Sequence, residues 1–162
     1  MKEETVVQWQ NSYSVGIKLI DEQHMTLINL TNRLFRDCME SHEQSMSTFL
    51  EIIHEAVDYV GYHFSTEEKI MERVNYPDYS NHKKEHAEFV REVFSKVEEF
   101  NSGKKNTPLA FVYFLRDWVL HHIAVSDRRM GVYIMTMHNN GELQKITVKV
   151  QNDDAKDRVR FM

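Results

Sequence analysis

Two pairs of possible metal ligands repeat at a four-residue interval in this chain. His63 and Glu67 form the first pair, and His82 and His86 form the second. Residues four apart lie about one turn apart on the same face of an α-helix, so each pair can direct both side chains to one ion. Either pair alone is weak evidence, because histidine pairs at this spacing also occur on solvated helix faces.

Three further residues turn these pairs into a metal-centre hypothesis. His24 follows the segment Ile20-Asp21-Glu22-Gln23, and His122 and Asp127 lie near the end of an apolar, aromatic segment. Buried polar groups on four separate helices would be costly without a common partner. The five imidazoles and two carboxylates are an inventory for two metal ions, and the candidate ligands are His24, His63, Glu67, His82, His86, His122 and Asp127.

The apolar periodicity predicts four helices that would position these side chains. Three of them cover about residues 19–39, 45–74 and 79–101, and the fourth starts at Thr107-Pro108, a hydroxyl N-cap followed by proline. The segment Asn75-Tyr76-Pro77-Asp78 separates the second helix from the third, since the residue before a proline disfavours helix. Four long helices with short connections predict an all-α fold, an up-down-up-down four-helix bundle with an extended N-terminal arm.

Length and composition indicate a single domain with an appendage. A chain of 162 residues with 41% hydrophobic content can build one packed core, which we assign to residues 1–137. Residues 138–162 form a short C-terminal extension, in which Asn139-Asn140-Gly141 is a turn signal. Ile146, Val148 and Val150 alternate with polar residues, so this extension is either a short strand or a mobile tail.

Charge and hydropathy exclude several classes of partner. The net charge is -5, the pI is near 6.0, and no basic stripe collects on a predicted helix, so no nucleic acid partner is expected. The first ten residues lack the apolar region of a secretory signal, and no stretch approaches the ~18 apolar residues of a membrane span. The prediction is a cytoplasmic protein with no membrane association. Cys38 is the single cysteine, so no intramolecular disulfide can form.

The motifs resemble those of a known family in order and spacing. Over about residues 5–134 the chain is similar to the hemerythrins, most closely to their bacterial branch, the bacteriohemerythrins. The matching segments are Trp9, Ser12-Tyr13-Ser14-Val15-Gly16-Ile17, Ile20-Asp21-Glu22-Gln23-His24, His63-Phe64-Ser65-Thr66-Glu67-Glu68, Tyr76-Pro77, His82 with His86, and Trp118 through His122-Ile123 to Asp127.

The resemblance implies a non-haem di-iron centre that binds O2 reversibly. It assigns His82, His86 and His122 to one iron and His24 and His63 to the other. Glu67 and Asp127 would bridge the two irons together with an oxo or hydroxo group. The iron with two imidazoles then keeps one coordination position open for O2. The residues placed to form an apolar O2 pocket are Leu27, Phe64, Trp118, Val119 and Ile123.

Several other polar residues are set aside. His121 points about 100° away from His122 on a helix, so only one of the two can face the centre. His42, His54 and His138 lack a partner at ligand spacing and are interpreted as surface or structural residues. We expect Glu68 to project off the bundle axis.

The function predicted from these residues is O2 storage, delivery or sensing, without enzymatic activity. One alternative is an O2-sensing or redox-sensing module that acts on a downstream signalling partner or within a homo-oligomer. The other is a di-iron oxidase or peroxidase, or a two-metal phosphohydrolase. Ferritin-like oxidases use carboxylate-rich Glu-x-x-His motifs, whereas this chain is histidine-rich and has no His-Asp dipeptide. NO is a further candidate ligand.

Overall fold

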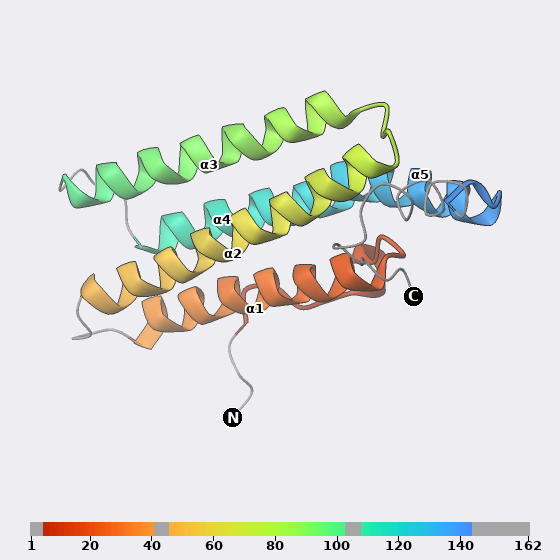
Figure 1. Cartoon of the computed structure of the whole chain (residues 1–162). Helices are drawn as coiled ribbons and strands as arrows, with labels where there is room; N and C mark the ends of the chain where they lie inside the picture. The colour runs from red at the N-terminus through yellow and green to blue at the C-terminus, as the bar shows by residue number, and fades with distance from the viewer. Residues whose placement is uncertain (1–4, 41–45, 103–107, 144–162) are drawn as a thin grey trace, which may run out of the picture.

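Four long helices pack side by side in the computed structural model, which describes residues 5–40, 46–102 and 108–143. They are α1 (Lys18–Glu40), α2 (Met46–Arg73), α3 (Tyr79–Asn101) and α4 (Pro108–His122). Each runs antiparallel to its neighbour in the sequence (Figure 1). The π-helical segment η2 (Ile123–Asp127) continues α4 into α5 (Arg128–Asn139), which projects beyond the bundle. The predicted all-α, up-down-up-down bundle is confirmed.

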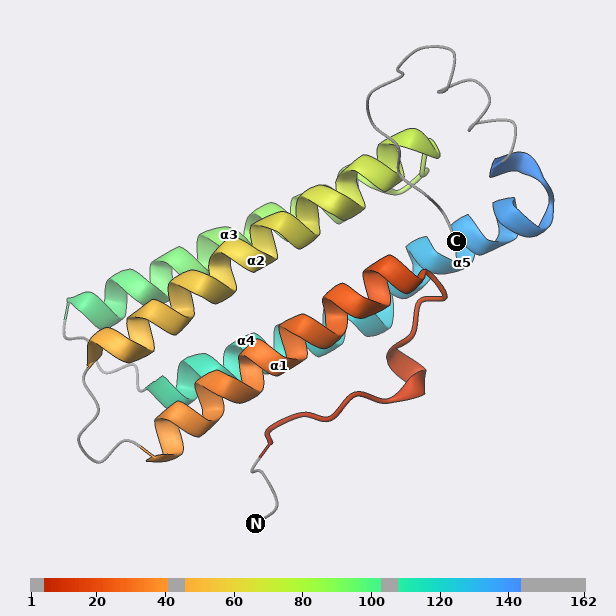
Figure 2. The ribbon, with the colours of Figure 1, turned by 60° about the horizontal axis from the view of Figure 1, so that its bottom comes forward.

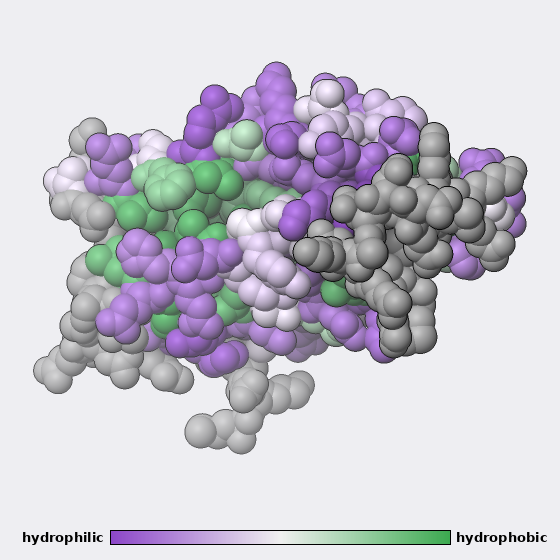
Figure 3. Space-filling view, in the orientation of Figure 1, coloured by the Kyte–Doolittle hydropathy of each residue, from purple (hydrophilic) through white to green (hydrophobic). Residues whose placement is uncertain are grey.

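The apolar interior is divided into two clusters along the bundle axis. The larger, which we call the main core, fills the half away from α5 and includes Leu34, Phe89 and Val112. It reaches the surface between α2 and α3, where apolar side chains interrupt a mostly hydrophilic face (Figure 3). The smaller, which we call the end cluster, lies beside α5 and includes Met71 and Met130.

The corner between α2 and α3 is fixed by a Schellman motif. Asn75 adopts the left-handed conformation, with φ of 49°. Its N–H donates to the carbonyl of Glu72 (3.2 Å), and the N–H of Tyr76 donates to the carbonyl of Met71 (2.9 Å). Tyr76 and Met71 also belong to the same end cluster, in keeping with the hydrophobic contact that frequently accompanies this motif. The predicted break at Asn75–Asp78 is confirmed, and it sets where the ligand pairs of α2 and α3 face each other.

The N-terminal arm runs along the bundle beside α1 (Figure 2). Two side chains of α1 hold it there. The Asn32 amide accepts hydrogen bonds from the N–H groups of Val6 and Val7 (3.0 and 3.1 Å) and donates one to the Val7 carbonyl (2.8 Å). The Asp21 carboxylate accepts from the Ser14 hydroxyl (2.6 Å) and the Val15 N–H (2.8 Å). The extended arm is therefore a docked part of the domain.

The far end of the chain is described as far as Leu143. Helix α5 runs two residues past position 137, and Gly141, with φ of 71°, lies in the turn that follows. The strand considered at Ile146, Val148 and Val150 lies outside the described residues, and the division into 1–137 and 138–162 stays a prediction. Every helix in the described ranges is too short or too polar to cross a bilayer.

Gly131 provides a test of how α5 packs on the arm. A Cβ atom there would lie 2.9 Å from the Val15 Cβ and closer still to the Val15 carbonyl oxygen, so side-chain growth must displace backbone. We expect Gly131→Ala to lower the free energy of unfolding by about 1–3 kcal/mol in urea denaturation, the usual range for overpacking.

Gly61 supplies the control for this substitution. It lies on the exposed face of α2, with nothing within 4 Å of its added Cβ. Gly61→Ala should be neutral or stabilise by up to about 1 kcal/mol through helix propensity. Equal effects of the two substitutions would contradict the close approach of α5 to the arm.

Candidate metal centre

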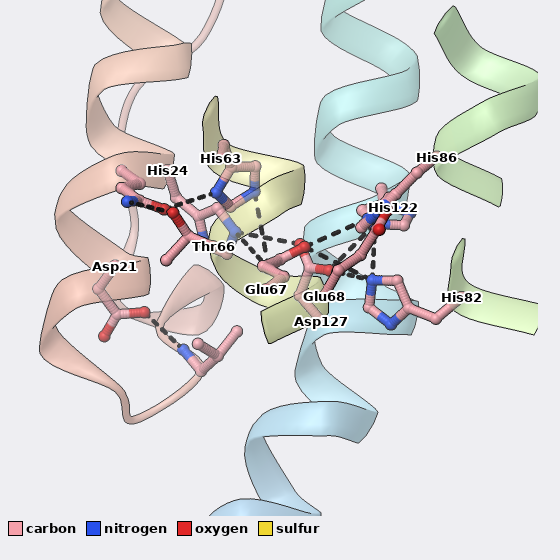
Figure 4. Close-up of polar contacts among 12 residues, drawn as sticks. Asp21, His24, His63, Thr66, Glu67, Glu68, His82, His86, His122 and Asp127 are labelled. Carbon is pink, nitrogen blue, oxygen red and sulfur yellow. Dashed lines mark hydrogen bonds and ion pairs between the residues drawn. The ribbon is translucent and has the colours of Figure 1, made fainter. Parts of the chain in front are cut away.

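All four helices of the bundle contribute to one buried polar layer (Figure 4). Along α1, α2, α3 and the continuous helix of α4, η2 and α5, residues of the end cluster lie on one side of this layer and residues of the main core on the other, as Ile20 and Leu27 do around His24. Every predicted ligand is at most 3% exposed. They are His24 from α1, His63 and Glu67 from α2, His82 and His86 from α3, His122 from α4 and Asp127 from η2.

A π-helical segment brings His122 and Asp127 to the same face. Five residues of an α-helix turn a side chain about 140° away from the first, which would send Asp127 out of the layer. In η2 the Arg128 N–H donates to the Ile123 carbonyl, the five-residue hydrogen bond of a π-helix. His122 Nε2 and Asp127 Oδ1 consequently lie 3.1 Å apart. His122 and Asp127 are five residues apart, whereas the ligands of each other pair are four apart. This difference is the sequence signal from which the π-helical segment could have been predicted.

Three imidazoles converge on one side of the layer. His122 Nε2 lies 3.0 Å from His86 Nε2 and 3.1 Å from His82 Nε2. Glu67 Oε2 is 3.2 Å from His86 Nε2, and Asp127 Oδ1 is 3.2 Å from His82 Nε2. Five ligand atoms from these side chains lie within 4.8 Å of one another.

Two imidazoles converge on the other side of the same carboxylates. His24 Nε2 lies 3.0 Å from Asp127 Oδ2 and 3.8 Å from Glu67 Oε1. His63 Nε2 lies 3.6 Å from Glu67 Oε1. This second group also fits within 4.8 Å, and it shares both Glu67 and Asp127 with the first. Figure 4 shows the two carboxylates between the two sets of rings.

The possible metal-ligand atoms at the centre of the layer lack hydrogen-bond partners among the described residues. Both nitrogens of His24 and all four carboxylate oxygens of Glu67 and Asp127 are inaccessible and have no aligned hydrogen-bond partner in the described part of the chain. The imidazole nitrogens lie close to the carboxylate oxygens, as His24 Nε2 does to Asp127 Oδ2, but the pairs do not meet hydrogen-bond geometry. These contacts are ion pairs when the imidazole is protonated. Such burial is costly unless a shared cation satisfies the lone pairs. The side chains present therefore fit two metal ions.

Protonation of the metal-free layer follows from burial and from the two carboxylates. Burial alone would lower the pKa of His24 and of His82, but the contacts with Asp127 and Glu67 outweigh it and raise both pKa values to about 9. Burial keeps the pKa of His63 below its usual value, although Glu67 opposes this. Burial would raise the pKa of both carboxyls, but the surrounding histidines hold them well below the usual range. Without metal, protons on histidine therefore balance the carboxylates at neutral pH.

Three residues behind the ligands were not recognised in the sequence. Glu68 Oε1 lies 3.2 Å from His86 Nδ1, so the expectation that Glu68 simply projects off the axis was wrong. Glu85 Oε2 lies 3.2 Å from His122 Nδ1 and accepts a hydrogen bond from the Ser126 hydroxyl. Gln23 Oε1 lies 2.9 Å from His63 Nδ1. Each adjoins a ligand in the sequence, which is too weak a signal to single it out.

The five residues predicted to form an O2 pocket all lie in or against the main core. Phe64 stacks on the His86 ring at 3.7 Å between centroids, and Trp118 stacks on the His122 ring at 4.4 Å. Leu27, Val119 and Ile123 are buried in the main core, against which Trp118 packs. These stacked rings restrict the orientation of two ligand imidazoles.

The histidines that were set aside lie away from this layer where the structure describes them. His121 is exposed while its neighbour His122 is buried, as expected for adjacent helical residues. His54 and His138 are also exposed. His42 lies outside the described residues.

Comparison with known proteins connects this geometry to a family. The model of the hemerythrin HHE cation binding domain matches residues 15–133, which include all seven candidate ligands. Bacteriohemerythrin of Pseudomonas paraeruginosa (strain DSM 24068 / PA7) is 32% identical over 137 residues, covering 85% of this chain and 86% of that protein. Bacteriohemerythrin of Stenotrophomonas maltophilia (strain R551-3) is 31% identical over 120 residues, covering 74% of this chain and 76% of that protein.

A solved structure agrees with the sequence relatives. The crystal structure of a wild-type hemerythrin superimposes with a TM-score of 0.71 at 26% identity, covering 78% of this chain and 96% of that one. The family-model match spans well over half of the chain and contains the buried histidine and carboxylate layer. The chain therefore belongs to the hemerythrin family, whose members are in general O2-binding proteins with non-haem iron.

Proposed function

We propose that this chain holds two iron ions and binds O2 reversibly, for storage, delivery or sensing. The observation that carries the proposal is that two converging groups of ligand atoms share the same two carboxylates. Glu67 and Asp127 belong to both groups, so they would help to hold both ions. Imidazole and carboxylate ligands are suited to iron.

The proposed ligand set is unequal. His82, His86 and His122 would hold one ion, and His24 and His63 would hold the other, with both carboxylates common to the pair. The ion with two imidazoles has fewer protein ligands and so keeps room for a small molecule. A pair of ferrous ions supplies electrons that O2 can take up on binding and return on release.

The protein's own contribution is to balance charge and exclude water. Glu67 and Asp127 carry negative charge into a layer that would otherwise hold only neutral ligands around two cations. The stacked rings of Phe64 and Trp118 hold His86 and His122 in place. Leu27, Val119 and Ile123 complete the apolar side on which we place the O2 pocket.

Reversible binding is favoured over enzymatic turnover because the buried carboxyl and imidazole groups are all assigned as metal ligands. Among the described residues, every buried carboxyl and imidazole group belongs to the seven proposed ligands, and Tyr76 is the one other buried ionisable side chain. A buried general acid or base for an oxidase, peroxidase or phosphohydrolase would have to be Tyr76 or a ligand itself. With a reductant present, O2 uptake should stop once the sites are filled, as an oxygen electrode can measure; continued consumption would favour the oxidase.

His82→Ala tests the ligand assignment. We expect it to abolish loading with two irons, because one of the three converging imidazoles is lost and Glu67 and Asp127 each lose a nearby nitrogen. Iron content per chain after anaerobic reconstitution is the measurement. His54→Ala, which removes an exposed histidine of α2, should retain both ions. Two irons per chain in the His82 variant would refute the assignment.

The raised histidine pKa values predict opposite pH dependences with and without metal. The pKa values of His24 and His82 rise from 6.5 to about 9 in the folded, metal-free chain. The stability this gives is complete below about pH 6.5 and is lost as pH rises through 9. Metal must displace these protons, so the loaded protein should instead bind metal more tightly as pH rises.

Urea denaturation between pH 6.5 and 9, with chelator or with ferrous iron under anaerobic conditions, measures both trends. The free energy of unfolding should fall with pH in the chelated sample and should not fall in the loaded one. Parallel behaviour of the two samples would mean that protons and metal do not compete for these imidazoles.

A further inference from the structure

The imidazole Nδ1 atoms that face away from the centre of the layer have different contacts on its two sides. On the three-histidine side, the Nδ1 atoms of His86 and His122 each lie 3.2 Å from a carboxylate oxygen, of Glu68 and Glu85 respectively. On the two-histidine side, His63 Nδ1 lies 2.9 Å from the neutral amide oxygen of Gln23. His24 Nδ1 is buried without a hydrogen-bond partner.

These outer contacts are themselves held in place. Lys83 Nζ lies 2.9 Å from the second oxygen of Glu68, and Ser126 donates its hydroxyl hydrogen to Glu85. Gln23 is 3% exposed, and its amide nitrogen donates to the Thr66 hydroxyl at 3.4 Å. Thr66 in turn donates to the Tyr62 carbonyl. The difference between the two sides is thus built from side chains of α1, α2, α3 and η2.

A metal-bound imidazole carries its remaining proton on the nitrogen that faces outward. An anionic acceptor for that N–H makes the ring a stronger ligand and fixes its orientation, and losing such a partner typically costs roughly 10- to 100-fold in metal affinity. A neutral amide gives the orientation with less of the electronic effect. On the side with three imidazoles, carboxylates therefore strengthen two of the metal ligands, His86 and His122. On the side with two imidazoles, no outer carboxylate of the described residues strengthens a ligand in this way.

We propose that Glu68, Glu85 and Gln23 set unequal affinities at the two metal positions. This rests on the proposed function, because it takes the cluster to hold two ions. The position of His82, His86 and His122 fills first, and the position of His24 and His63 fills second and empties first. Since the weaker position is the one with room for O2, oxygen binding by this chain would depend on the supply of its second iron.

Anaerobic titration of ferrous iron into the metal-free protein, followed by calorimetry, tests the proposal. Wild-type protein should give two dissociation constants. Glu68→Gln and Glu85→Gln keep the side-chain shape and remove the charge, so each should weaken the tighter constant by roughly tenfold and leave the weaker one unchanged. Gln23→Glu introduces the missing carboxylate, toward which the Thr66 hydroxyl can turn, and should strengthen the weaker constant by a similar factor.

Glu72→Gln and Glu88→Gln are matched controls. They remove the same charge from the exposed faces of α2 and α3, one turn from Glu68 and three residues from Glu85, and should change neither constant. Circular dichroism of each metal-free variant checks that the bundle is retained. If Gln23→Glu does not fold, the two Glu→Gln variants still decide the matter.

The failures of the two proposals are distinguishable. Uptake of fewer than two ferrous ions by the wild-type chain would overturn the proposed di-iron function. Uptake of two ions with constants that Glu68→Gln and Glu85→Gln leave unchanged, or shift only as much as the controls do, would overturn the unequal-affinity proposal alone. A loss confined to the weaker constant in those variants would also overturn it.

Discussion

Seven ionisable side chains packed between two apolar clusters are the constraint on which this structure depends. Charged groups are expensive to bury, and an unpaired one costs several kcal/mol even after relaxation. Here Glu67 and Asp127 are fully buried at the centre, with no hydrogen bond to their oxygens. The layer can be stable only if cations are shared across it, either as protons on histidine or as metal ions.

Each helix accommodates this layer in its own way. α2 and α3 use the ordinary one-turn spacing, and the Schellman corner at Asn75 directs their two ligand pairs toward each other. The long helix formed by α4, η2 and α5 leaves the α-helical repeat for one π-helical turn, so that His122 and Asp127 both face inward. The arm adds no ligand, but its attachment to Asp21 lies one turn from His24. The π-helical turn thus lies where the two ligands of this long helix require it.

The sequence predicted the helices and the ligand candidates because both leave a local periodic signal. Apolar residues repeat at helical spacing, and His63 with Glu67 and His82 with His86 repeat at one turn. The break at Asn75 was predicted from the proline that follows it and not from the left-handed torsion of the asparagine. The close approach of Gly131 to Val15 depends on a contact distant in the sequence, which no local pattern encodes. The same is true of Glu68, Glu85 and Gln23. Glu68 was dismissed from its angle on the helix, yet its side chain is long enough to reach back to His86.

The most direct test of the central claim is the visible spectrum of the iron-loaded protein. The anaerobically reduced protein is recorded, exposed to air, returned to anaerobic conditions and recorded again over several cycles. If this chain binds O2 reversibly at a pair of irons, a charge-transfer band should appear with oxygen and disappear when oxygen is removed. A band that forms once and cannot be reversed without a reductant, or no oxygen-dependent band in protein that holds two irons, would contradict the account.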